Sequence, residues 1–195
     1  VEFIPDWHWG FYIIPDFFTE DQYKELKFRI ENVYKYIPTY QPSDYPLSER
    51  HLHGDRLKHF PCWETTNLEN IDTEFNSIIK EKHKKFLGLD GIDFKSFVRK
   101  TLTAEVKRSM INGKNSQIHT DKSDFASVIY FENAPRNGLA IFDNGGDVPS
   151  LSIGAEPNRL ILYKGNRPHS ACFDSSFEVR YALCSFITIS KEEIN

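Results

Sequence analysis

Between residues 97 and 189 the chain is a succession of short apolar segments separated by turn-forming clusters, and this pattern constrains the fold more than any other feature. In the first segment Leu102 and Ala104 alternate with threonines, which is the period of two typical of a half-buried strand. The linkers, such as residues 112–115 and 133–138, are rich in Asn, Gly and Pro, which favour turns. Further strands are expected at residues 117–121, 125–131, 139–142, 148–153, 159–163, 168–173 and 179–189. About eight strands are enough to close a jelly roll or barrel-like sandwich.

The first third of the chain is expected to form helices that support this β core. Thr19 and Gln22 fit a capping box at the start of one helix. A second helix is predicted around residues 71–86, where apolar side chains share one face, and Gly88 is placed to end it. Helices of this kind pack on the outer side of a sheet.

The expected fold is therefore mainly β with flanking helices: a distorted double-stranded β-helix, the cupin-like jelly roll, with α-helices packed on one sheet. One domain would span residues 1–195. Within it, residues 1–96 would hold an N-terminal strand, the helices and a long loop, and residues 97–189 would form the double-stranded β-helix core.

Composition bounds the function classes. A net charge of −4 without a concentrated basic stripe gives no electrostatic footprint for nucleic acid, and no apolar run reaches the length of a membrane span. Three cysteines without C-x-x-C spacing are typical of reduced thiols, so a cytoplasmic location is expected. Composition says nothing about the oligomeric state.

A candidate metal site comes from three residues. His119 and Asp121 are two positions apart, so on a strand they would project from the same face, and His169 follows about fifty positions later. Two histidines and one carboxylate form the facial set that binds non-haem Fe(II) and leaves positions open for O2 and a co-substrate. A second H-x-D, at residues 53–55, falls in a stretch without apolar alternation and is predicted to be loop.

Arg180 is the second informative residue. On the last predicted strand it shares a face with Ala182 and Cys184, whereas Val179 and Tyr181 lie on the other face. A guanidinium among small and apolar side chains is costly unless an anion meets it. A dicarboxylate with one end on the metal and the other on Arg180 would satisfy it.

These residues carry a family resemblance. The segments around His119-x-Asp121, residues 127–133 and 137–142, the stretch 159–170 that contains His169, and the strand from residue 179 resemble the Fe(II)- and 2-oxoglutarate-dependent oxygenases, most of all the prolyl-4-hydroxylase-like branch. The resemblance covers residues 97–189 and extends to the opening strand and helix at residues 13–22.

The resemblance implies a hydroxylase that couples oxidation of a substrate to decarboxylation of 2-oxoglutarate, with release of succinate and CO2. His119, Asp121 and His169 would hold Fe(II), and Arg180, eleven residues after His169, would bind the far carboxylate of 2-oxoglutarate. Met110 stands where relatives commonly carry a tyrosine that helps to hold 2-oxoglutarate, and Ala182 is expected to line the same pocket. Prolyl hydroxylases usually carry Lys at the position of Arg180, so the substrate is left open between a peptidyl residue and a small metabolite.

Two alternatives use the same barrel. One is a cupin-like module that binds a metal or ligand without turnover, and the other is a Zn or Mn hydrolase or isomerase that uses the same three residues. Iron-dependent formation of succinate separates both from the oxygenase.

The segment 38–67 is too long for an ordinary connector. It is rich in aromatic and histidine residues and lacks periodicity, so it is either a surface loop or a lid that contacts substrate at the mouth of the barrel.

Overall fold

A computed structural model of the chain describes residues 10–38, 62–102, 118–143, 145, 148–172 and 178–190. Several sequence-based predictions lie outside these residues: the second H-x-D at 53–55, the turn at 112–115, Met110, the rest of the first predicted strand beyond Leu102, and most of the segment proposed as a lid.

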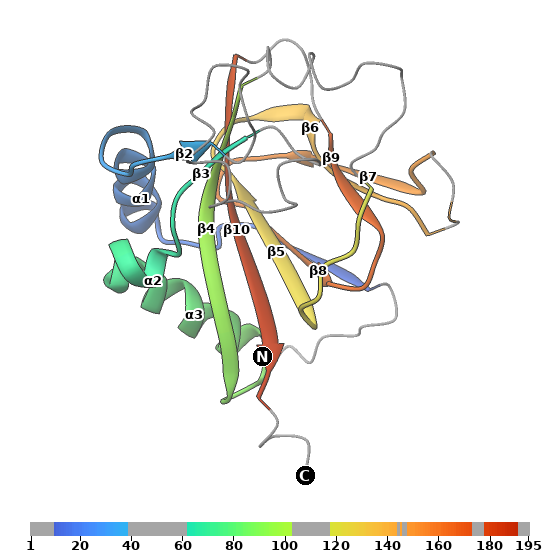
Figure 1. Cartoon of the computed structure of the whole chain (residues 1–195), viewed down its shortest axis with the longest axis horizontal. Helices are drawn as coiled ribbons and strands as arrows, with labels where there is room; N and C mark the ends of the chain where they lie inside the picture. Colours follow the sequence, from blue (N-terminus) through green and yellow to red (C-terminus); the bar gives the residue numbers. More distant parts are fainter. Residues whose placement is uncertain are drawn as a thin grey trace, which may run out of the picture.

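Two antiparallel sheets make up most of the described chain (Figure 1). The larger sheet has seven strands in the order β1 (Phe11–Ile14), β8 (Leu160–Lys164), β5 (Phe125–Tyr130), β10 (Val179–Ile189), β4 (Ile92–Leu102), β3 (Trp63–Glu64) and β2 (Ile37–Pro38). The smaller sheet has three strands in the order β7 (Leu151–Ala155), β6 (Ala134–Ile141) and β9 (His169–Cys172). The prediction of a mainly β fold is confirmed.

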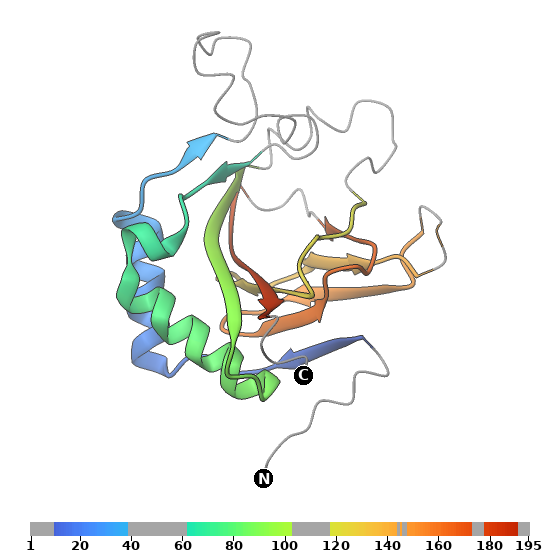
Figure 2. The same ribbon diagram turned by 60° about the horizontal axis from the view of Figure 1, so that its bottom comes forward.

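The helices lie on one side of the long strands β4 and β10, away from the smaller sheet (Figures 1 and 2). Helix α1 (Glu20–Asn32) begins at the predicted capping box of Thr19 and Gln22. After the single turn α2 (Leu68–Ile71), helix α3 (Thr73–Leu87) ends at Gly88, which adopts the left-handed conformation with φ 67°. Glycine suits this position because a side chain there would be strained. In the described part of the chain no helix has both the length and the apolar character needed to cross a membrane.

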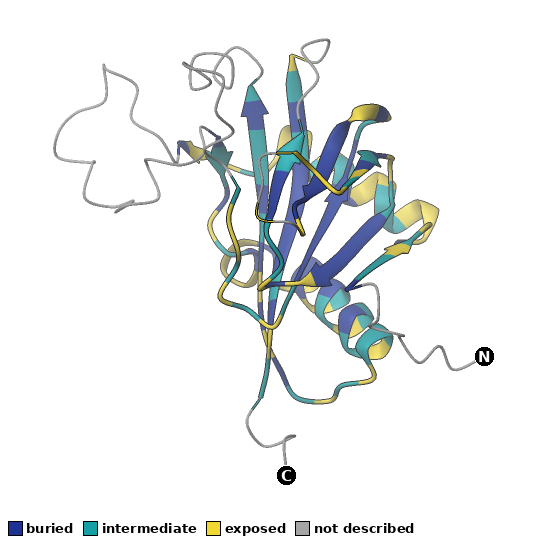
Figure 3. Ribbon diagram, turned by 90° about the vertical axis from the view of Figure 1, so that its right-hand side faces the viewer, coloured by how far each residue is buried: buried dark blue, intermediate teal, exposed yellow. Residues whose placement is uncertain are grey.

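Two hydrophobic cores follow from this layering, and buried residues fill the middle of the molecule (Figure 3). The outer core lies between the helices and the larger sheet, and includes Leu26, Ile79 and Leu183. The inner core lies between the two sheets, and includes Leu139 of the smaller sheet and Ala182 of the larger one. Strand β10 therefore contributes alternate residues to the two cores, as its sequence predicts.

Three strands begin more than one residue away from their predicted starts. Strand β4 begins at Ile92 instead of residue 97, because alternate apolar residues already pack under the helices. Strand β7 covers Leu151–Ala155 instead of 148–153. Strand β6 begins at Ala134, inside the predicted turn 133–138, and its pairing with β7 shifts between Ala134 and Gly138. Turn-forming residues can continue a strand where they form a bulge of this kind.

Glycine is required at the end of this bulge. Gly138 has φ 147°, and a Cβ there would lie 1.9 Å from the carbonyl oxygen of Ile153. The close approach of the two backbones, and not a chain reversal, explains the glycine.

Candidate metal centre

The predicted strand 117–121 is reduced, in its described part, to a single β-bridge between His119 and His169. The His119 amide donates to the His169 carbonyl at 3.0 Å, and the His169 amide donates to the His119 carbonyl at 2.9 Å. These two backbone hydrogen bonds bring the two histidines together. The expectation that a regular strand aligns His119 and Asp121 is wrong, although the two side chains do converge.

His119, Asp121 and His169 each offer a ligand atom, and these atoms lie within 4.8 Å of one another. Nε2 of His119 is 3.8 Å from Oδ1 of Asp121, and Nε2 of His169 is 3.4 Å from Oδ2. The His119 side chain is 48% exposed, whereas Asp121 is 11% and His169 4% exposed. The cluster is thus enclosed on one side and open on the side of His119.

The hydrogen bonds of the His169 ring leave the lone pair of Nε2 directed at the cluster, where it can bind a metal. Its Nδ1–H donates to the carbonyl of Arg167 at 2.8 Å, which places the lone pair on Nε2. The hydroxyl of Tyr163, on β8, donates to that Nε2 at 3.2 Å. No sequence motif includes Tyr163, although it lies on the inward face of a strand only six residues before His169.

Burial shifts the pKa of both enclosed groups toward their neutral forms. Desolvation raises the pKa of Asp121, against the lowering effect of His119 and Arg99. Desolvation, with the charges of His119 and Arg99, lowers the pKa of His169 to about 4. A bound divalent cation would stabilise the carboxylate and would need the neutral imidazole.

Gly165 holds the loop that carries Asp121. The Asp121 amide donates to the Gly165 carbonyl at 2.7 Å, and the Gly165 amide donates to the Asp124 carbonyl at 2.9 Å. A Cβ at Gly165 would lie 2.0 Å from the carbonyl oxygen of Ser123, so any side chain would displace this loop. Asp124, three residues beyond Asp121, accepts a hydrogen bond at Oδ2 from the amide of Ile189.

Arg180 lies on the inner face of β10, as predicted, and its side chain is 7% exposed. Its Nη1 donates to the carbonyl of Cys172 at 2.8 Å and its Nη2 to that of Gly138 at 3.4 Å, both in the smaller sheet. The guanidinium carbon lies 4.4 Å from the centre of the Tyr130 ring. Arg180 therefore spans the space between the sheets.

Arg180 forms an ion pair with Glu132, whose Oε1 lies 4.0 Å from Nε. Burial raises the pKa of Glu132, and the charge of Arg180 acts in the opposite direction. Ala182, the other predicted pocket residue, is buried in the inner core two residues beyond Arg180. Met110 lies outside the described residues.

The residues fit a divalent metal ion. Among the described residues, Oδ2 of Asp121 is buried and accepts no hydrogen bond, although it faces Nε2 of His169. Buried carboxylate oxygens normally have a partner, and a cation would supply one here. Two imidazoles and one carboxylate are the donors of a facial iron site.

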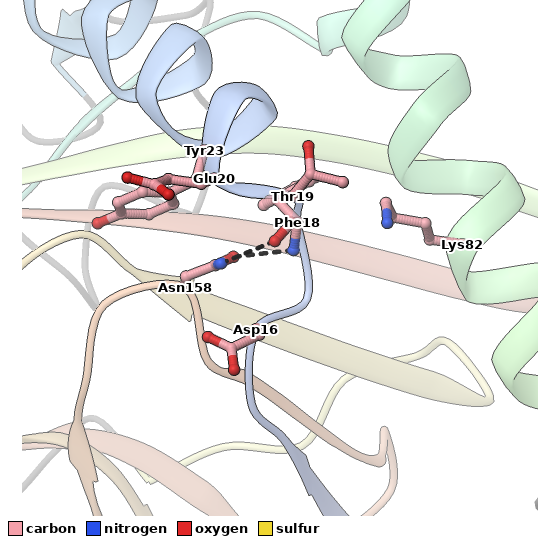
Figure 4. Close-up of a pocket in the computed structure, with 7 residues that line it drawn as sticks. All are labelled: Asp16, Phe18, Thr19, Glu20, Tyr23, Lys82 and Asn158. Carbon is pink, nitrogen blue, oxygen red and sulfur yellow. Dashed lines mark hydrogen bonds between the residues drawn. The ribbon is translucent and has the colours of Figure 1, made fainter.

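A separate hollow of about 530 Å³ lies at the start of α1 (Figure 4). It is lined by Asp16, Phe18, Thr19, Glu20, Tyr23, Lys82 and Asn158. Asn158 donates to the carbonyl of Phe18 and accepts from its amide, so its polar atoms serve the chain itself. None of the three candidate metal ligands lines this hollow.

Neither a protein-family model nor a curated protein sequence matches the chain, but solved structures do. An oxidoreductase of the 2OG-Fe(II) oxygenase family from Burkholderia pseudomallei matches with TM-score 0.60 and 12% identity over 93% of this chain and 86% of that chain. A prolyl-4-hydroxylase from Pseudomonas putida matches with TM-score 0.55 and 13% identity over 92% of each chain. The non-heme alpha-ketoglutarate-dependent epimerase SnoN from nogalamycin biosynthesis matches with TM-score 0.59 and 9% identity over 92% of this chain and 78% of that chain.

These matches establish the fold. The chain has the double-stranded β-helix fold of the 2OG-Fe(II) oxygenases, with helices packed on the larger sheet, and the predicted fold class is confirmed.

Proposed function

We propose that this protein is an Fe(II)- and 2-oxoglutarate-dependent oxygenase that hydroxylates a small-molecule or peptide substrate and releases succinate and CO2. The observation that carries the proposal is the convergence of His119, Asp121 and His169 within 4.8 Å, inside a fold shared with enzymes of this class. Bound Fe(II) would supply the oxidative chemistry, with 2-oxoglutarate and O2 as co-substrates.

His119, Asp121 and His169 would hold the metal. The Arg167 carbonyl keeps His169 in the tautomer that a metal needs, and the backbone bridge between the histidines fixes their separation. The open side of the cluster, at His119, leaves room for substrate.

Arg180 would bind the distal carboxylate of 2-oxoglutarate. It contacts Cys172, three residues beyond His169 on β9, which corresponds to about 10 Å along a strand. A five-carbon dicarboxylate fits between a metal and a guanidinium at this spacing. Buried guanidinium groups bind carboxylates strongly because the hydrogen bonds are charge-assisted and can be bidentate.

Hydroxylation is proposed as the reaction because the prolyl-4-hydroxylase matches over nearly the full length of both chains. The match to an epimerase means that the product must be measured directly.

The experiment is to measure succinate formed from 2-oxoglutarate by the purified protein with Fe(II), and to repeat it with Zn(II) or Mn(II). We expect succinate to form with Fe(II) and not with Zn(II) or Mn(II). In Arg180→Ala the KM for 2-oxoglutarate should rise by one to two orders of magnitude, equivalent to about 1.4–2.7 kcal/mol, which is the range of a hydrogen bond to a charged group. Arg180→Lys should recover part of this loss, while metal affinity stays unchanged in both variants.

Failure of the iron-loaded protein to form succinate, with metal bound and with candidate substrates present, would favour the binding module. Turnover of another kind with Zn(II) or Mn(II) would favour a hydrolase or isomerase. Unchanged 2-oxoglutarate dependence in Arg180→Ala would remove Arg180 from the co-substrate site.

A further inference from the structure

A carboxylate, Glu132, lies beside Arg180 just beyond the end of β5. Strand β5 pairs with β10 so that Tyr130 is opposite Ala182, and continuing this register by two residues places Glu132 opposite Arg180. Oε1 of Glu132 is 4.0 Å from Nε of Arg180, and the Glu132 side chain is only 15% exposed. The two groups are therefore neighbours by strand register as well as by distance, and both are largely enclosed by the protein.

The two carboxylate oxygens of Glu132 differ in their contacts. Oε2 accepts a hydrogen bond from the amide of Tyr181 at 3.4 Å. Oε1 is buried and accepts no hydrogen bond from any residue that the structure describes. A buried polar atom without a partner is costly, so Oε1 is the oxygen that would gain from a new hydrogen bond.

Arg180 would hold two carboxylates at once when the co-substrate is bound. Its guanidinium already lies beside Glu132, and it is also the group proposed to bind the distal carboxylate of 2-oxoglutarate. Two carboxylates that are close together in an enclosed site repel each other, and one of them then keeps a proton. The protonated group can donate a hydrogen bond to the other, so the repulsion is replaced by an attraction.

Glu132 is well placed to hold that proton. Burial raises the pKa of Glu132, and the charge of Arg180 and three nearby backbone amides lower it only in part. A second carboxylate at Arg180 would raise this pKa further, because a like charge disfavours ionisation. The protonated form of Glu132 would thus be more stable with the co-substrate bound than without it.

The other groups around Glu132 keep their charge states between pH 6 and pH 8. Burial raises the pKa of Tyr23, on α1, to about 12, and it also raises the pKa of Tyr181 on β10. Burial likewise raises the pKa of Tyr130 on β5. Arg180 stays a cation, because a guanidinium does not lose its proton in a protein. Of these described neighbours none is expected to titrate in this range, which leaves Glu132.

We propose that Glu132 takes up a proton from solvent when 2-oxoglutarate binds, and that it donates this proton from Oε1 in a hydrogen bond to the distal carboxylate. The O–H bond of Glu132 is the only covalent bond that forms, and nothing is oxidised or reduced. The assignment rests on the proposed oxygenase function. It adds Glu132 to the residues that bind the co-substrate.

Proton uptake makes the affinity for 2-oxoglutarate depend on pH. Because the complex holds the proton more tightly than the unbound protein, the affinity is highest at low pH. It falls as the pH rises past the pKa of Glu132 in the unbound protein, by up to about tenfold per pH unit. The fall ends when the pH reaches the pKa of Glu132 in the complex.

The test is calorimetry of 2-oxoglutarate binding to the full chain loaded with Ni(II), from pH 6 to pH 8. Repeating each titration in buffers of different ionisation enthalpy gives the number of protons taken up. Ni(II) keeps the candidate metal ligands deprotonated, so their titration does not contribute. We expect uptake that approaches one proton per co-substrate, and a Kd that rises by at least about tenfold across this range.

A variant assigns the proton to Glu132. Glu132→Gln keeps the shape of the side chain and an N–H donor but cannot ionise. It should take up no proton, and it should bind 2-oxoglutarate as well as the unmodified protein does near pH 6 and at least about tenfold more tightly at pH 8. Glu81→Gln, at an exposed glutamate on α3, is the matched control and should leave the proton uptake unchanged.

Two outcomes would overturn the proposal: 2-oxoglutarate binds without proton uptake throughout this pH range, or the uptake persists in Glu132→Gln. The first outcome needs no variant, so it is decisive even if Glu132→Gln does not fold. In either case Glu132 is only a structural partner of Arg180. Failure of the proposed oxygenase function would look different, because 2-oxoglutarate itself would not bind to the Ni(II)-loaded protein.

Discussion

The outer core and the inner core each bury a histidine, and the two histidines are alike in burial, in the contact of Nδ1 and in pKa. His83, on α3, lies between the helices and the larger sheet and is fully buried. His169 begins strand β9 of the smaller sheet and is also buried. In each ring Nδ1 contacts a backbone carbonyl at 2.8 Å, and burial lowers the pKa of each histidine to about 4.

The difference lies at the other ring nitrogen. Nε2 of His83 contacts the hydroxyl of Ser127 at 2.8 Å, and the ring packs at 5.2 Å from Phe17 and 5.3 Å from Phe94. Nε2 of His169 faces Asp121, and the ring centre of His119 lies 4.4 Å away. A depressed pKa therefore reports burial in both regions, and only the groups facing Nε2 separate a structural histidine from a candidate ligand.

The largest effect that tests this comparison is the loss of metal affinity. His169→Ala should weaken Ni(II) or Fe(II) binding by at least about two orders of magnitude. Loss of a residue that only hydrogen-bonds to a metal ligand already lowers metal affinity by about 10–100-fold, and loss of the ligand itself should have a larger effect. His83→Ala is the matched control and should bind metal normally. Metal titration of both folded variants checks this, and normal affinity in His169→Ala would remove it from the site.

A smaller effect is expected on the free energy of unfolding, and here the His83 variant should lose more than the His169 variant. His83→Ala should lower the free energy of unfolding by about 2–3 kcal/mol, since it leaves a cavity among aromatic rings and removes the partner of the buried Ser127 hydroxyl. His169→Ala in metal-free protein should cost less, because Tyr163 loses only one bond beside an open cluster. Urea unfolding of both variants is the measurement. An equal loss in both would mean that the two regions are not distinct in stability.

The smallest effect is a pH dependence. Because the pKa of His83 is about 4 in the folded protein and near 6.5 when unfolded, the unfolded chain binds more protons between these values. The stability due to neutral His83 is complete above pH 6.5 and is lost as the pH falls toward 4, with a limiting slope of about 1.4 kcal/mol per pH unit. In His83→Gln this slope should shrink, as measured by urea unfolding from pH 7 to 4.5. An unchanged slope would assign the acid sensitivity to other groups, His169 among them.

The sequence by itself determined the regular parts of the molecule. Strand β10 matches its predicted bounds, residues 179–189, because its side chains alternate strictly between two cores. Helix α1 begins at its capping box, and Gly88 ends α3, because both signals act within one turn of the chain. The H-x-D pair and His169 were found in the same way, from residue type and spacing.

Only the tertiary structure decided how these parts meet. The bulge at Gly138 depends on a second backbone approaching from elsewhere in the chain, and for this reason the turn predicted at residues 133–138 is wrong. His119 reaches His169 through one long-range bridge, not through a strand. Tyr163 reaches His169 because the register of the strands places its side chain on the inner face. Periodicity is a property of neighbouring residues, whereas register and contact between distant strands are set by the packing of the whole fold.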